Sequence, residues 1–91
     1  MAKIKITHQH TRSHDEVFEA AKGLASRLKR EHGVSCEWSQ SGATMKGKGV
    51  AGRLIIAPGQ IDIEVSLGLA MSLFKSLVEK EMRDYLTRHL S

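Results

Sequence analysis

The chain has 91 residues, of which 41% are hydrophobic and 26% are charged, and its formal net charge is +4. This length suits a single domain with one core, over residues 1–91, and the composition excludes wholesale disorder. A lone cysteine, Cys36, excludes an internal disulfide, and we see neither a secretory leader nor the roughly 18 consecutive apolar residues of a membrane span, so we expect a cytoplasmic protein.

The first half of the chain predicts a strand followed by a helix. Residues 3–8 alternate charged and apolar side chains, as in a strand with one buried face. Ser13 and Glu16 then have the spacing of a capping box, and an apolar stripe with helical period continues to about residue 31. Gly33 suits the left-handed residue that ends many helices.

Four strands are expected next, at residues 34–39, 43–48, 53–57 and 61–67. The glycines of residues 49–52 suggest a bend or bulge before the third of these strands. Pro58 and Gly59 form a turn that joins the last two strands as a hairpin. After Gly68 the apolar period changes from two to between three and four, which predicts a long amphipathic helix.

We expect this last helix to cover the sheet with its apolar stripe, which comprises Leu69, Leu73, Phe74, Leu77, Val78, Met82, Tyr85 and Leu86. Only Met71, Leu90 and the edges of the stripe would then remain for a partner. The order β-α-β-β-β-β-α predicts an α+β fold, with an antiparallel sheet and both helices packed on one face. The other face, which carries the charged strand residues, should be exposed to water.

Two glycine motifs match nucleotide-binding patterns in their letters only. Residues 47–52 match GxGxxG and residues 42–48 match GxxxxGK, but neither precedes a helix whose N-terminus could hold phosphates. Gly49 also occupies the position where the second motif needs Ser or Thr. We therefore expect no nucleotide cofactor at either motif.

The residues that could carry other chemistry are few. His8, His10 and His14 are weak candidates for a zinc or copper site, because no cysteine or carboxylate completes the set. Cys36 lies in phase with apolar strand residues and is expected in the core. Asp62 and Glu64 share one strand face, but no pocket is implied. We expect neither an enzyme nor a bound cofactor.

Lys46, Lys48 and Arg53 flank the glycine bend and are candidate partner-binding residues. Nucleic-acid surfaces usually combine such charges with exposed aromatic side chains. The four aromatic residues, two Phe, one Trp and one Tyr, instead fall on or beside core-facing patterns. This pattern weighs against nucleic-acid binding.

Several short segments resemble the polyhydroxyalkanoic acid system family, small bacterial proteins linked to polyhydroxyalkanoate (PHA) synthesis, use or granule surfaces. The matching segments are residues 4–6, 21–25, 36–38, 49–52 and 63–68, and the resemblance covers nearly the whole chain. These motifs are structural in character. The resemblance therefore implies membership of the family, and it assigns no catalytic residues to this chain. It implies a non-enzymatic accessory or regulatory protein of PHA metabolism, acting at granules or on granule proteins. The candidate for contact with a granule is the last helix, through Leu69, Leu73, Leu77 and Leu86, although the same stripe is needed to cover the sheet.

Two alternatives come from other classes. One is a helix-grip-like module for an apolar ligand or protein partner, which predicts a cavity of a few hundred cubic ångströms between helix and sheet. The other is a nucleic-acid-binding domain, whose affinity would fall steeply with salt. An edge strand or Ile55 could also support a homodimer.

Overall fold

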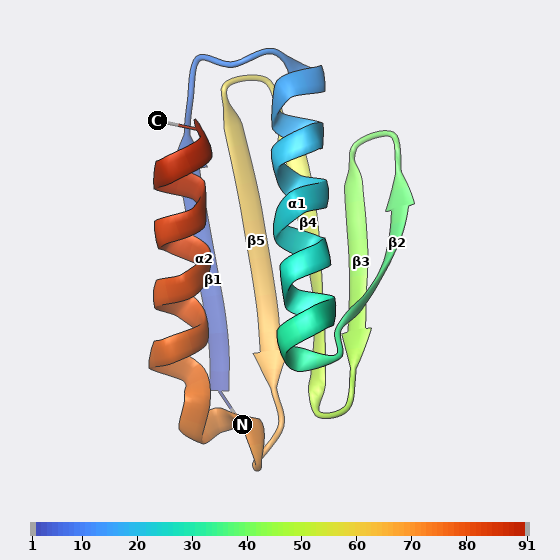
Figure 1. The fold of residues 1–91 in the computed structure, drawn as a ribbon, viewed down its shortest axis with the longest axis vertical. Helices are drawn as coiled ribbons and strands as arrows, with labels where there is room; N and C mark the ends of the chain where they lie inside the picture. Colours follow the sequence, from blue (N-terminus) through green and yellow to red (C-terminus); the bar gives the residue numbers. More distant parts are fainter. Residues whose placement is uncertain (1, 91) are drawn as a thin grey trace.

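In the computed structural model, which describes residues 2–90, a five-stranded antiparallel sheet is covered on one face by two helices (Figure 1). The elements are β1 (Ala2–Gln9), α1 (His14–His32), β2 (Ser35–Ser39), β3 (Gly42–Gly47), β4 (Val50–Ala57), β5 (Gln60–Leu67), the 3₁₀ helix η1 (Met71–Phe74) and α2 (Lys75–Leu90). The α+β class and the order of strands and helices expected from the sequence are confirmed. None of the helices described is long and apolar enough to cross a membrane.

The strands lie in the order β1-β5-β4-β3-β2, so β1 and β2 form the two edges of the sheet. The sequence suggested a bend or a bulge at residues 49–52, but the pairing of β4 with β3 and β5 is regular and contains no bulge. Gly49 instead forms the turn into β4, which begins at Val50, and Gly52 lies within that strand. A Cβ atom at Gly52 would collide with the carbonyl of Glu64, so glycine is needed there for close strand packing.

The capping interactions expected at both ends of α1 are present. Ser13 Oγ accepts a hydrogen bond from the Glu16 N–H, and the Ser13 N–H donates to the Glu16 carboxylate, both at 3.3 Å. This backbone hydrogen bond is the main reason that the pKa of Glu16 lies below its ordinary value. At the other end, Gly33 adopts a left-handed conformation with φ of 69°.

The core lies between the helices and the sheet. In Figure 1, α2 lies over the β1 edge and α1 lies over β4. Each helix contributes four buried residues: Val17, Ala21, Leu24 and Leu28 from α1, and Val78, Met82, Leu86 and Leu90 from α2. No polar or charged residue in the range described is fully buried. At the edge of the core, the partly buried His32 Nε2 and Glu81 Oε2 lie 3.0 Å apart and connect the end of α1 to α2.

The start of the last helix differs from the sequence-based expectation. The chain first makes the 3₁₀ helix η1, and α2 begins only at Lys75. In Figure 1 the connection between β5 and α2 lies past the end of the strands. Leu69, Leu73 and Phe74 in this connection are exposed, as is Leu77 in the first turn of α2, and the expectation that these four residues belong to the core was wrong.

Candidate functional site

The main candidate site is a group of large apolar side chains at the β5–α2 connection and in the first turn of α2. Leu69 and Leu73 are 81% and 86% exposed, and Phe74 and Leu77 are 49% and 55% exposed. We call these four residues the apolar corner. The other large hydrophobic residue exposed in residues 2–90 is Ile55, on the opposite face of the sheet. Clustered apolar exposure of this kind is typical of an interaction site.

Hydrogen bonds hold the backbone of the apolar corner against the sheet. The Gly68 N–H donates to the carbonyl of Gly49 in the β3–β4 turn at 2.8 Å. The Ser72 N–H donates to the Gly68 carbonyl at 2.9 Å, and Ser72 Oγ donates to the Leu69 carbonyl at 2.7 Å. The exposed leucines thus project from a backbone that is fixed by the neighbouring turn.

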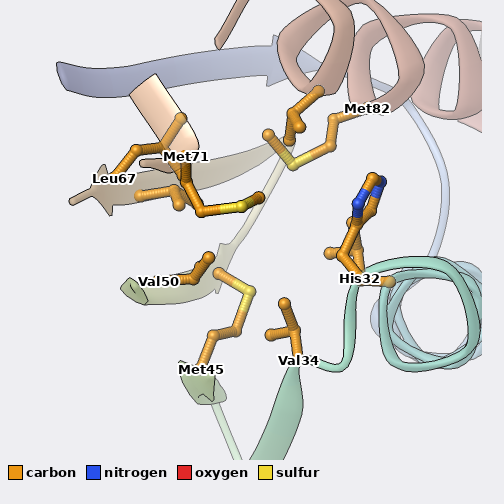
Figure 2. A pocket seen from close by; sticks show the side chains of 10 residues that line it. His32, Val34, Met45, Val50, Leu67, Met71 and Met82 are labelled. Atoms are coloured by element: carbon orange, nitrogen blue, oxygen red, sulfur yellow. The ribbon is translucent and has the colours of Figure 1, made fainter. Parts of the chain in front are cut away.

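The side chain of Met71, in η1, points into the fold. Figure 2 shows its side chain converging with those of Met45 and Met82 on an apolar space that His32 also lines. This space has a volume of about 20 Å³, and a second space beneath α1 has about 10 Å³. Each holds about one water molecule at most. Neither fulfils the expectation of a ligand cavity of a few hundred cubic ångströms between helix and sheet.

The structure separates the residues that we predicted to bind a partner. Leu90 is buried, so it is not available at the surface, and Met71 is only partly exposed and packs against the core. Lys46 and Arg53 lie on the open face of the sheet, where Arg53 Nη2 is 3.9 Å from Glu64 Oε1. Lys48 is exposed in the β3–β4 turn, next to the glycine that holds the apolar corner.

The three candidate histidines do not form one site. His8 Nε2 and His10 Nε2 are both buried without a hydrogen-bond partner, whereas His10 Nδ1 accepts from the Arg12 N–H at 3.1 Å. His14 faces the β2–β3 turn, with Nε2 at 3.1 Å from the Gln40 carbonyl and its ring stacked on Phe18. Among residues 2–90, no three His, Cys, Asp or Glu side chains are placed to share a metal ion.

The other residues considered for catalysis are held in structural interactions. Asp62 accepts hydrogen bonds from Thr7 Oγ1 at 2.8 Å and from Gln60 Nε2 at 2.9 Å, and Glu64 faces Arg53. Cys36 is partly buried rather than fully buried, and burial raises the pKa of its thiol. A raised pKa lowers the thiolate fraction, so this cysteine has the character of a structural residue and not of a nucleophile.

Comparison with known proteins gives the family. Residues 4–90 match the family model described as "Putative polyhydroxyalkanoic acid system protein". The chain belongs to this family. No match is found among curated proteins.

Among solved structures, the chain is similar to the NMR structure of PA4090 from Pseudomonas aeruginosa, with a TM-score of 0.58 and 13% sequence identity. The similarity covers 97% of this chain and 83% of that chain. At this identity the similarity shows a shared fold alone.

Sequence reasoning named Leu69, Leu73 and Leu77 as possible granule contacts but favoured their burial, although the sequence contains a signal for their exposure. Between Leu67 and Val78, apolar residues recur so densely that they would surround a helix instead of forming one stripe. A helix on one face of a sheet can bury only one stripe. Part of this segment therefore had to stay exposed, and the structure shows that its first turns do.

Proposed function

We propose that this chain is a non-enzymatic accessory protein of PHA metabolism that attaches to the surface of polyester granules through the apolar corner. Family membership supports a role in a PHA system. The observation that carries the proposal is the exposure of Leu69, Leu73, Phe74 and Leu77, four large apolar residues close together in the chain at the β5–α2 connection and the start of α2. The protein would act in the cytoplasm, at the granules.

The size of the apolar corner suits attachment to an apolar surface. Complete burial of one leucine side chain contributes about 1.5–3 kcal/mol. A flat surface covers only part of each side chain, so we take about 1.5 kcal/mol for each of Leu69 and Leu73. Together they would contribute about 3 kcal/mol, which corresponds to roughly a hundredfold in binding.

The backbone that carries these side chains also favours attachment. Because Gly68 and Ser72 are hydrogen-bonded in place, little backbone freedom is lost when the leucines reach a surface. Lys48 lies beside this segment and would remain in water at the edge of the contact. Anionic groups on a granule surface would strengthen attachment through this lysine.

Cosedimentation with granules tests the proposal. We expect the double variant Leu69→Ser/Leu73→Ser to bind granules roughly a hundredfold more weakly than the wild type. The matched control is Ile55→Thr, which removes an exposed apolar side chain from the open sheet face and should bind normally. All three proteins should unfold at similar temperatures, since the substituted side chains are exposed.

The same assay with particles of pure polyester identifies the binding surface. Retention on pure polyester, lost in the double variant, would support direct attachment. Retention only on granules that keep their proteins would show that a granule protein is the binding partner. Equal retention of the wild type and the double variant on both materials would contradict the proposal.

A further inference from the structure

The second surface of interest is the sheet edge formed by β2. This strand is the last in the sheet, and Figure 1 shows no element beyond it on the side away from β3. An edge strand leaves unpaired backbone N–H and C=O groups that can pair with another strand. The other edge strand, β1, carries Lys3 and Lys5, and lysines are a common means of protecting an edge. The sequence of β2, SCEWS, contains no lysine, arginine or proline.

A groove runs along this edge between β2 and α1. Its volume is about 320 Å³. The groove is lined by Lys22, Ser26 and Lys29 from α1 and by Ser35, Cys36 and Trp38 from β2. A strand added to β2 would place every second side chain in this groove, because strand side chains alternate between two faces.

The groove combines positive charge with a partly buried apolar floor. Lys22 and Lys29 are both exposed and lie two helical turns apart, about 10 Å along the helix axis. Lys22 Nζ lies 4.9 Å from the centre of the Phe18 ring and has only a distant carboxylate partner, Glu19, at 4.0 Å. Within residues 2–90, Lys29 has no ion pair. Trp38 packs on Phe18 with ring centres 5.2 Å apart.

We propose that the β2 edge binds an acidic, extended segment of another protein as a sixth strand of the sheet. The backbone of β2 would supply the pairing, and the two lysines would select acidic side chains. An acidic–x–apolar–x–acidic pattern fits the groove. In a strand its two acidic residues lie about 13 Å apart, whereas the two lysines lie about 10 Å apart along the helix axis. Flexible lysine side chains can span the difference between these two spacings. The central apolar residue would contact Trp38 and Cys36.

Charge favours this partner over a second copy of the chain. If two β2 strands paired around a twofold axis, both α1 helices would lie on the same face of the joined sheet. The Lys22 and Lys29 side chains of the two copies would then face each other, and like charges at such a contact are unfavourable. An acidic segment meets the same lysines with opposite charge. The proposal is independent of granule attachment, because the apolar corner precedes α2, which packs over the β1 edge.

Amide chemical shifts of the isotopically labelled full chain test the proposal. The probe is a synthetic peptide with the acidic–x–apolar–x–acidic pattern, in which the acidic residues are glutamate, the apolar residue is valine and the intervening residues are threonine. In the control peptide, lysine replaces each glutamate. We expect the acidic peptide to shift the amide signals of residues 35–39. The variant Lys22→Glu/Lys29→Glu should weaken this binding at least about tenfold. The variant Lys3→Glu/Lys80→Glu changes the net charge equally at distant exposed positions and should bind like the wild type.

The competing outcomes are distinct. No shift of residues 35–39 at millimolar acidic peptide would overturn the proposal, and so would equal shifts with the lysine peptide. Shifts of these amides with protein concentration alone would show that a second copy occupies the edge, which would also overturn it. The spectrum of each variant shows directly whether the variant is folded.

Discussion

The two helices cover the same face of the sheet, but they begin in opposite ways. The first turn of α1 has a capping box, and the apolar stripe of this helix is buried along its length. The helical segment that leads into α2 begins after Ala70 without a side-chain cap, and the apolar corner, with Leu69 just before this segment and the other three residues in its first turns, is exposed. A helical apolar pattern is therefore not sufficient for burial. The pattern must also lie within the length of the sheet.

The largest change in the free energy of unfolding should come from a substitution in the buried part of α2, and a substitution at its exposed start should have little effect. Met82 is fully buried, so Met82→Ala should leave a cavity and lower the free energy of unfolding by about 2–5 kcal/mol. Leu73→Ala in the apolar corner should change it by no more than about 0.5 kcal/mol. Urea unfolding of both variants measures the difference. Similar losses for the two variants would show that Leu73 belongs to the core.

A second pair of variants tests how the apolar corner is held in place. Gly49 has φ of 74°, a left-handed conformation, so Gly49→Ala should cost about 1–2 kcal/mol of stability. Gly68 is its hydrogen-bonded neighbour, and a Cβ atom there would meet only ordinary contacts, the closest at 3.5 Å. Gly68→Ala should therefore be neutral or slightly stabilising. A neutral Gly49→Ala variant in thermal unfolding would mean that this turn does not fix the segment.

A smaller effect is expected at the start of α1. Ser13→Ala removes the cap and should lower the free energy of unfolding by about 1 kcal/mol. Ser76→Ala, at an exposed position of α2, is the matched control and should have no measurable effect. If chemical denaturation gave the two variants equal stability, the capping box would contribute nothing to the fold.

The smallest effect concerns pH. The pKa of Glu16 is lowered in the folded state, so the ionised carboxylate stabilises the fold above the ordinary value of 4.5. This contribution is lost as the pH falls from about 4.5 through the lowered pKa. Stability measured across this range should therefore fall less steeply for Glu16→Gln than for the wild type. Parallel pH profiles would contradict the role of this carboxylate.

The fold could be predicted from the sequence in some detail, because the capping and turn residues agree with the apolar periodicity in most of the chain. Alternation in β1 and β5, the capping box of α1 and the glycine at its end all correspond to observed features. The regular passage of β4 through Gly52 was not predicted, because a glycine pair suggests a bulge equally well. Only the packing against Glu64 explains why glycine is needed there.

The candidate sites were harder to predict, because exposure depends on where an element lies in the fold. Periodicity assigned Leu73 and Phe74 to the core and left Leu90 free, and the structure reverses both assignments. The groove at β2 depends on the strand order, which places β2 at an edge beside the lysines of α1. Nothing in the local sequence of Trp38 or Lys29 indicates that neighbourhood.

A fluorescent label that responds to polarity tests the central claim most directly. The label would be attached at Leu73→Cys in a Cys36→Ser background, with Ile55→Cys in the same background as the control position. If the apolar corner attaches to granules, adding granules should shift the emission at position 73 to the blue and leave position 55 unchanged. An unchanged signal at position 73, or an equal shift at both positions, would contradict attachment through the apolar corner.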